Sequence, residues 1–125
     1  MAKTVEELVK AARAEVPAIS PAEAKRLHGR EDTVFLDVRE PVEVAAGKVK
    51  GALAIPRGVL EFQVGSAENR PSTLSEDKTV IVYCAGGGRA ALAGQTLKAM
   101  GFADVRNLGG YKDWVEADGE TERDI

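Results

Sequence analysis

The run Thr79-Val80-Ile81-Val82-Tyr83-Cys84 is the segment that most constrains how this chain can fold. Its β-branched and aromatic residues favour a strand. An apolar run that barely alternates with polar residues is typical of a strand buried on both faces, as in a parallel sheet. The run Thr33–Val38 has the same character, so we expect a second buried strand there.

Helical segments are predicted around these strands from their capping signals. Thr4-Val5-Glu6-Glu7 is a capping box and predicts a helix that ends near Glu15, before Pro17. A second box, Ser20-Pro21-Ala22-Glu23, predicts a helix that ends near His28-Gly29. The other expected elements are a helical turn at Pro41–Ala46, a strand at Ala52–Ile55, a helix within Arg57–Arg70, a helix at Arg89–Met100, a strand at Asp104–Asn107 and a helix at Tyr111–Ala117.

The succession of strands and helices predicts an α/β fold, with a small parallel β-sheet flanked by helices on both faces. A chain of 125 residues buries enough surface for one hydrophobic core, which argues for one domain. We expect residues 1–15 to form an N-terminal helical appendage and residues 16–125 to form that single domain.

The charge and residue content exclude several classes of function. Seventeen lysines and arginines against 20 aspartates and glutamates leave a net charge of −3, which provides no basic surface for nucleic acid. No apolar run is long enough to span a membrane, and the early acidic residues do not fit a signal peptide. One cysteine and one histidine exclude a disulfide framework and an ordinary zinc site. We therefore expect a cytoplasmic domain with a single thiol, no metal, and neither nucleic acid nor membrane as a partner.

The chemistry of the chain is expected at Cys84 and the loop that follows it, Ala85-Gly86-Gly87-Gly88, up to Arg89. A buried strand delivers Cys84 to the carboxyl end of the sheet, where open α/β sheets bind ligands. Glycines allow conformations with φ > 0, so the loop amides can turn inward and bind an anion beside the next helix start. Such surroundings favour the thiolate, and Arg89 adds a permanent forked cation. The pattern predicts a nucleophile for an anionic substrate, against the simpler alternative of an unreactive buried cysteine followed by a turn.

Two charged residues, Asp37 and Arg39, follow the buried strand that begins at Thr33. We expect Asp37 to bind a neighbouring arginine or loop amides beside the active site, as structural support rather than as a catalytic group. The alternative is a surface ion pair, which would contribute under about 1 kcal/mol.

Four segments, in this order and spacing, resemble the rhodanese family of single-domain sulfurtransferases. The loop Cys84–Ala90 is similar to the family's active-site loop, and Phe35–Glu40 is similar to its Asp-Val-Arg-Glu segment. Gly47–Pro56 follows the pattern Gly-His-Ile-x-Gly-Ala-x-x-Ile-Pro, and Leu108–Trp114 follows Leu-x-Gly-Gly-x-x-x-Trp. The resemblance covers about residues 16 to 118 and implies a rhodanese-like fold.

The resemblance also implies a thiosulfate-type sulfurtransferase that requires no cofactor. The Cys84 thiolate would take a sulfane sulfur from a donor such as thiosulfate and become a persulfide. It would then pass the sulfur to cyanide, to a thiol, or to a sulfur-carrier or redox protein. The amides of the loop from Ala85 to Arg89 would stabilise the persulfide, and Arg89 would hold the oxyanion end of the donor.

The sequence departs from the family at two positions. Ala90 stands where many members carry Ser or Thr, and Lys48 stands where His is usual.

Two other functions remain open. A cysteine-dependent phosphatase of the same fold also uses a thiolate and an arginine, but its loop is one residue longer than the four residues between Cys84 and Arg89. The second alternative function is that of a non-catalytic binding or sulfur-relay module.

Overall fold

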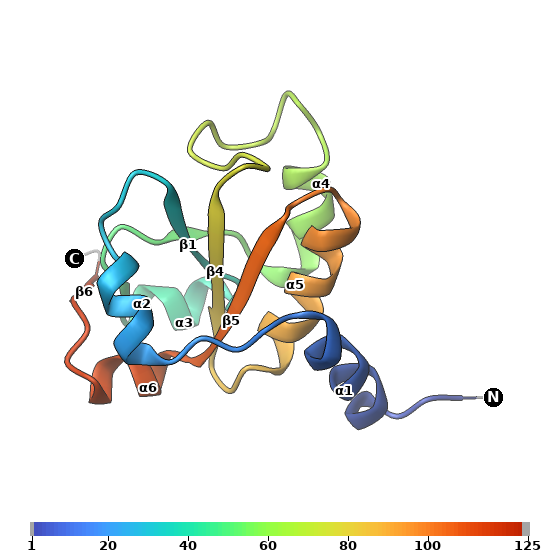
Figure 1. Ribbon diagram of the computed structural model, residues 1–125, viewed down its shortest axis with the longest axis horizontal. Coiled ribbons are helices and arrows are strands. Elements are labelled where there is room, and N and C mark those ends of the chain that lie inside the picture. Colours follow the sequence, from blue (N-terminus) through green and yellow to red (C-terminus); the bar gives the residue numbers. More distant parts are fainter. Residues whose placement is uncertain (1, 124–125) are drawn as a thin grey trace.

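A computed structural model describes residues 2–123 of the chain, and four parallel strands form its central sheet (Figure 1). The strands are β1 (Thr33–Asp37), β3 (Leu53–Ala54), β4 (Thr79–Cys84) and β5 (Asp104–Gly110), in the order β3-β1-β4-β5. The two strands expected from their apolar runs therefore lie side by side, with Thr33 opposite Thr79 and Asp37 opposite Tyr83. A separate antiparallel pair joins β2 (Lys48–Val49) to β6 (Thr121–Glu122).

Helices cover both faces of this sheet, as the sequence predicts. On one face, Leu60 and Val64 of α4 (Leu60–Val64) pack with Leu97 of α5 (Gly88–Ala99) in one buried cluster. On the other face, Ala24 of α2 (Pro21–Leu27) and Trp114 of α6 (Tyr111–Glu116) belong to a second cluster. Figure 1 shows α1, α4 and α5 on one side of the sheet and α2 and α6 on the other. The expected fold class is confirmed.

The capping signals in the sequence correctly predict where two of the helices begin. The Glu7 amide donates to Thr4 Oγ1 over 3.1 Å at the start of α1 (Val5–Glu15), and the Glu23 amide donates to Ser20 Oγ over 3.1 Å at the start of α2. A short helix, α3 (Pro41–Ala45), follows β1 and begins at a proline, where the missing amide proton costs nothing.

The helix expected within Arg57–Arg70 is present and occupies only the first part of that range. The chain forms one 3₁₀ turn, η1 (Arg57–Val59), and continues into α4, which ends at Val64. The Arg70 Nε then donates to the Val64 carbonyl over 2.7 Å and satisfies an acceptor at the helix end. Beyond Val64 the chain turns instead, because the Asn69 and Arg70 amides both donate to the Ser66 carbonyl.

The C-terminal part of the sheet also differs from the prediction. Strand β5 does not stop at Asn107 but continues through Gly109 and Gly110. Gly109 has φ +94°, and the β4–β5 register shifts at this point, so the two glycines belong to a bulged strand. The strand β6 has no local sequence signal, and it forms because Thr121–Glu122 pairs with β2.

Helix α1 packs along α5 beside the sheet. Ala12 is fully buried, and the Glu15 carbonyl accepts from Lys98 Nζ over 2.8 Å. Just after α1, the Val16 methyl groups fill the space beside Gly94, where an added Cβ would come within 2.9 Å of them. The proposed boundary between an appendage and a domain at residues 15 and 16 stays a prediction. Within residues 2–123, no helix has the length and apolar content needed to cross a membrane.

Candidate active site

Cys84 is the last residue of β4, the strand between β1 and β5, and its side chain is buried at the carboxyl end of the sheet. The Gly87 amide donates to Cys84 Sγ over 2.9 Å. Gly87 has φ +97° and immediately precedes α5, so a residue without a Cβ is needed to turn this amide back toward the sulfur. Ala85 and Gly86 are exposed at the outer edge of the loop. One amide of the loop, that of Gly87, is therefore turned toward the sulfur.

Asn107 of β5 holds this loop from the neighbouring strand. Its Nδ2 donates to the Gly87 carbonyl over 3.2 Å, and its Oδ1 accepts from the Gly109 amide over 2.8 Å. On the same side Gly110 lies against the Ala85 carbonyl, with no room for a Cβ. Sequence reasoning missed Asn107, which is buried; an asparagine at the end of an expected strand, two residues before Gly109, was the available signal.

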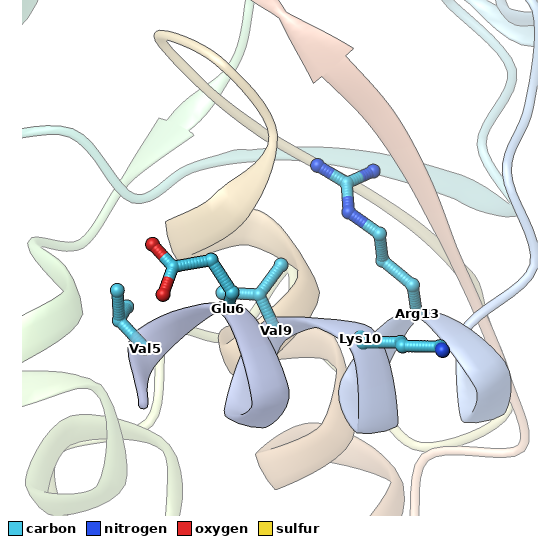
Figure 2. Close-up of a pocket in the computed structure, with 5 residues that line it drawn as sticks. All are labelled: Val5, Glu6, Val9, Lys10 and Arg13. Carbon is cyan, nitrogen blue, oxygen red and sulfur yellow. The ribbon is translucent and has the colours of Figure 1, made fainter. Parts of the chain in front are cut away.

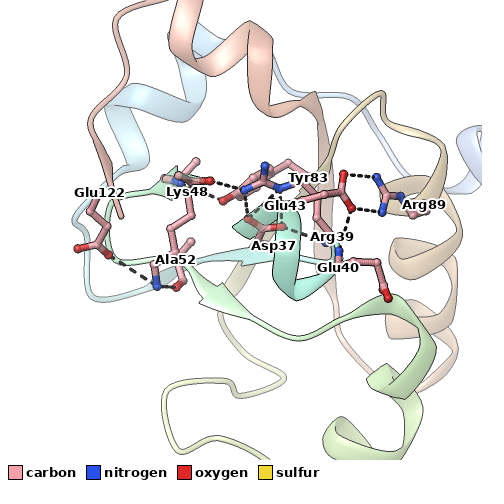
Figure 3. Close-up of polar contacts among 11 residues, drawn as sticks. Asp37, Arg39, Glu40, Glu43, Lys48, Ala52, Tyr83, Arg89 and Glu122 are labelled. Carbon is pink, nitrogen blue, oxygen red and sulfur yellow. Dashed lines mark hydrogen bonds and ion pairs between the residues drawn. The ribbon is translucent and has the colours of Figure 1, made fainter. Parts of the chain in front are cut away.

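Arg89, in the first turn of α5, binds Glu43 of α3 through both ends of its guanidinium (Figure 3). Its Nη1 lies 2.7 Å from Glu43 Oε1, and its Nη2 lies 3.0 Å from Glu43 Oε2. Glu43 also accepts from the Glu40 amide at the start of α3. Sequence reasoning missed Glu43; the spacing Glu40-Pro-Val-Glu43, typical of a helix start, would have pointed to a buttressed carboxylate.

The Arg89–Glu43 pair changes the proton affinity of both groups. The hydrogen bonds from Arg89, followed by the bond from the Glu40 amide, lower the pKa of Glu43 to about 2. The Glu43 carboxylate raises the pKa of Arg89, and Cys84 contributes to this shift to a smaller extent. Both residues therefore stay charged at neutral pH.

Asp37 and Arg39 form a buried pair, not the surface ion pair that was the alternative. Asp37 is fully buried, and it accepts from both the Arg39 amide and the Arg39 guanidinium over 2.7–3.1 Å. Arg39 also donates to the Gly47 carbonyl over 2.6 Å and lies 4.4 Å from the ring centre of Tyr111. The pair thus joins the end of β1 to the chain before β2.

Tyr83, which precedes Cys84 in β4, also takes part in the polar contacts around Asp37 and Arg39. Its hydroxyl accepts from the Val49 amide over 3.0 Å. Burial raises the pKa of Tyr83 well above its usual value, and the Asp37 carboxylate opposite it adds to the shift. The phenol therefore stays neutral, and its role is to fix β2 against β4.

Lys48 and Ala90, which depart from the family pattern, each have a structural role in this fold. Lys48 Nζ donates to the Ala52 carbonyl over 2.8 Å and lies 3.7 Å from Glu122 Oε2 (Figure 3). Lys48 therefore helps to hold β2 and β6 together. Ala90 is fully buried in the cluster under α5. No group of three metal-ligating side chains occurs in the part of the chain that the structure describes.

Helix α1 borders the loop on its outer side, which the sequence did not predict. A Cβ built on Gly87 would lie 3.0 Å from Arg13 Nη2, and one built on Gly88 would lie 3.8 Å from Val9 Cγ2. Figure 2 shows Arg13 reaching from α1 toward the loop, beside a hollow of about 400 Å³. Val5, Glu6, Val9, Lys10 and Arg13 line this hollow.

Comparisons with known proteins agree with the geometry. A family model of the rhodanese-like domain matches residues 20–117. A sulfurtransferase of Allochromatium vinosum is 32% identical over 93 residues, which are 74% of this chain and 80% of that protein. The human thiosulfate:glutathione sulfurtransferase is 32% identical over an alignment of 110 positions, and the match covers 80% of this chain and 94% of that protein.

A solved structure is similar over nearly the full length. It is a Rhodopseudomonas palustris protein of unknown function, described as a possible tyrosine phosphatase. It has a TM-score of 0.87 and 33% sequence identity, and the match covers 98% of this chain and 96% of that one. The similarities together support a function of the sulfurtransferase type. Since the family model spans most of the chain, and two sulfurtransferases match it at 32% identity, the protein belongs to the rhodanese-like domain family.

Proposed function

We propose that the protein is a thiosulfate-type sulfurtransferase that carries sulfur as a persulfide on Cys84. The observation that carries this proposal is the Gly87 amide, which donates to Cys84 Sγ over 2.9 Å inside a loop closed by Arg89. An amide aimed at sulfur stabilises negative charge there without reorganising during the reaction. The same donor can serve the thiolate and, after loading, the persulfide.

In the first half-reaction the Cys84 thiolate attacks the outer sulfur of thiosulfate. A sulfur–sulfur bond forms to Cys84 Sγ, the sulfur–sulfur bond within thiosulfate breaks, and sulfite leaves with the electron pair. Two thiolate-like charges approach each other in this step, so cations near the sulfur lower the barrier. Arg89 supplies such a charge, and its pair with Glu43 keeps the guanidinium in place.

In the second half-reaction an acceptor nucleophile attacks the outer sulfur of the persulfide and regenerates the Cys84 thiolate. Cyanide would leave as thiocyanate, and a thiolate would leave as its own persulfide. The exposed edge at Ala85 and Gly86 gives an acceptor access to the loop. We include among the acceptors a small thiol, as the name of the human relative indicates for that protein, and a sulfur-carrier or redox protein. We place this chemistry in the cytoplasm, where a single thiol stays reduced.

The proposal is tested by intact-mass measurement after incubation with thiosulfate. We expect the mass of one added sulfur atom, removed by dithiothreitol or cyanide, and no addition to the Cys84→Ser variant. Serine nearly matches the thiol in size, so that variant should keep its fold, which circular dichroism checks. Absence of any dithiothreitol-sensitive sulfur with thiosulfate, polysulfide or an organic thiosulfonate contradicts the proposal.

The same samples decide between this function and the two alternatives. Hydrolysis of an aryl phosphate without persulfide formation would favour a phosphatase, the activity suggested for the R. palustris protein. A persulfide that forms from a protein donor but not from any small donor would favour a sulfur-relay module.

A further inference from the structure

Two glycines of β5, Gly109 and Gly110, lie against the active loop, and neither has a side chain to anchor it. A Cβ built on Gly110 would clash with the Ala85 carbonyl oxygen, and a Cβ built on Gly87 would lie 3.3 Å from Gly109 Cα. Gly110 is also the register partner of Cys84 across the two strands. The conformation of the loop therefore depends on where this bare stretch of β5 lies.

Backbone pairing alone holds the two glycines weakly. Gly109 has φ +94° and belongs to the bulge, where the β4–β5 register shifts. Glycine has more conformational freedom than any other residue, and a bulge leaves part of the strand ladder unpaired. Side chains on either side of the glycines are therefore needed to fix their position. Asn107 does this from before the bulge, because its Oδ1 accepts from the Gly109 amide over 2.8 Å.

Tyr111 is the first side chain after the two glycines, and its ring has three neighbours. The ring stacks on that of Tyr83, with 6.0 Å between the ring centres and 24° between the planes. The Arg39 guanidinium lies 4.4 Å from the Tyr111 ring centre, which is a cation–π contact. The Tyr111 hydroxyl lies over Gly47, 2.8 Å from the position that a Gly47 Cβ would occupy. The start of α6 is thus joined to β4 and to the segments that follow β1 and precede β2.

Two of these neighbours are themselves fixed in the core. The Arg39 guanidinium donates to Asp37, which is fully buried, so the cation keeps one orientation. Tyr83 is also fully buried, and it directly precedes Cys84 in β4. The stacked rings therefore connect the residue before the thiol on β4 to the residue after the register partner of the thiol on β5. This connection supports the two strand ends at the bulge, where the ladder is weakest.

The position of Gly110 affects the chemistry because the Ala85 carbonyl and the Gly86 amide belong to one peptide group. A peptide group is planar and trans, so its C=O and N–H point in opposite directions. By restricting the carbonyl, Gly110 also restricts the direction of the Gly86 amide. Loop amides whose directions are fixed beforehand stabilise negative charge on a sulfur without reorganising during the reaction.

We propose that Tyr111 is a positioning residue for sulfur transfer: its ring keeps Gly110 against the Ala85 carbonyl and thereby keeps the loop amides in the directions that stabilise the charged sulfur. Tyr111 acts through the backbone of β5 rather than by contact with the sulfur. The aromatic ring, rather than the hydroxyl, is the part that positions the loop. This inference rests on the proposed sulfurtransferase function.

The kinetic test compares three variants that circular dichroism shows to be folded. Tyr111→Leu removes the ring, Tyr111→Phe removes only the hydroxyl, and Phe35→Leu removes a buried ring of the same cluster that packs on His28 and Trp114. We expect the rate of persulfide formation at saturating thiosulfate to fall about tenfold in Tyr111→Leu and to stay within about twofold of wild type in the other two.

Phe35→Leu controls for loss of stability. Phe35 is buried and Tyr111 is half-buried, so Phe35→Leu should be the more destabilised variant in urea. An equal loss of rate in Phe35→Leu and Tyr111→Leu would show that the rate follows stability, and it would overturn the positioning role. An equal loss in Tyr111→Phe and Tyr111→Leu would overturn the assignment of that role to the ring.

Gly110→Ala tests whether Tyr111 acts through Gly110. Gly110 has φ −101°, which alanine adopts without strain, so the added methyl acts chiefly on the Ala85 carbonyl. We expect persulfide formation to be at least about tenfold slower in this variant. The double variant Gly110→Ala/Tyr111→Leu should be no slower than the slower single variant, because both changes disturb the same contact. Losses of rate that multiply would show that the two residues act independently, and they would overturn the proposed route.

Alkylation of Cys84 by iodoacetamide separates this inference from the proposed function, since it needs no sulfur donor. Misdirected loop amides stabilise the thiolate less, so the pH of half-maximal alkylation rate should rise by about half a unit in Tyr111→Leu and stay unchanged in Phe35→Leu. This result supports the positioning role even if no persulfide forms on Cys84. If persulfide forms at the wild-type rate in Tyr111→Leu and the pH profiles coincide, the sulfurtransferase proposal stands and the role of Tyr111 is overturned.

Discussion

Asn107 shows how one buried amide can position a reactive loop that it does not itself enter. Its Nδ2 holds the Gly87 carbonyl, and its Oδ1 holds the Gly109 amide within the bulge of β5. The Gly87 peptide presents its own amide to Cys84 Sγ. Any rotation of that peptide would move the donor away from the sulfur.

Replacing Asn107 by two different residues separates support of the loop from support of the strand. Asn107→Ala removes both bonds and should lower the free energy of unfolding by about 1–3 kcal/mol, since it leaves a partly buried amide at Gly109 without its acceptor. Asn107→Asp keeps an oxygen for Gly109 but places an oxygen against the Gly87 carbonyl. We therefore expect Asp to lower the rate of persulfide formation about tenfold while stability falls less than with Ala. Urea unfolding and single-turnover mass measurements check this, and equal rates in wild type and Asn107→Asp would contradict it.

Between elements, the loop that joins β4 to α5 sets the size of the anion site. Four residues separate Cys84 from Arg89, and the Gly87 amide closes the loop on the sulfur. A phosphoryl group in transfer has three equatorial oxygens and needs a wider set of donors than one persulfide sulfur. We therefore expect the short loop to favour sulfur over phosphorus.

Inserting one glycine between Gly87 and Gly88 should reverse this preference. The insertion adds backbone without a side chain, and glycine adopts the φ > 0 conformations that the loop uses. We expect sulfur transfer from thiosulfate to be lost and affinity for phosphate to increase, with at most slight hydrolysis of aryl phosphates. A glycine inserted between Ala67 and Glu68, in an exposed turn away from the loop, is the control. Retention of full sulfur transfer by the loop variant would show that loop length does not control the chemistry.

Across the protein, carboxylates held by hydrogen bonds and by ion pairs set how stability depends on pH. The pKa of Glu43 is lowered to about 2, first by its bonds to Arg89, and the pKa values of Asp104, Glu61 and Glu122 are also lowered. A carboxyl whose pKa is lower in the folded state binds fewer protons there than in the unfolded chain. Its contribution to stability is therefore complete above the unfolded pKa and is lost as the pH falls through the folded pKa.

This reasoning predicts that Glu43→Gln makes stability less sensitive to acid. For wild type we expect the free energy of unfolding to decrease from about pH 4.5, the ordinary value for a glutamate, down to about pH 2. The variant should lose less over the same range, and it should be less stable than wild type at pH 7. Because the Glu43 side chain is 31% exposed, solvent screening makes this difference smaller than the pKa shift alone suggests. Urea titrations at several pH values measure it, and parallel curves for the two proteins would contradict it.

Local patterns were sufficient for much of the fold and for the centre of the site. The apolar runs identified β1 and β4, the capping residues Thr4 and Ser20 identified two helix starts, and the glycines after Cys84 indicated the loop whose Gly87 amide contacts the sulfur. Each of these signals acts over a few residues, through strand propensity, helix-end hydrogen bonds or backbone freedom, so a short stretch of sequence contains all of its causes.

The residues around Cys84 that come from distant segments could not be predicted in this way. Glu43 and Arg89 are 46 positions apart, and Asn107 and Gly87 are 20 positions apart. They meet because β4 lies between β1 and β5, and because α1 packs on α5 with Arg13 turned to the loop. Strand order and helix rotation follow from the packing of the complete core, which no short pattern encodes. The sequence therefore singled out Cys84 as the candidate nucleophile, and the tertiary structure decided which charges surround its loop: Glu43 on Arg89, and Arg13 beside Gly87.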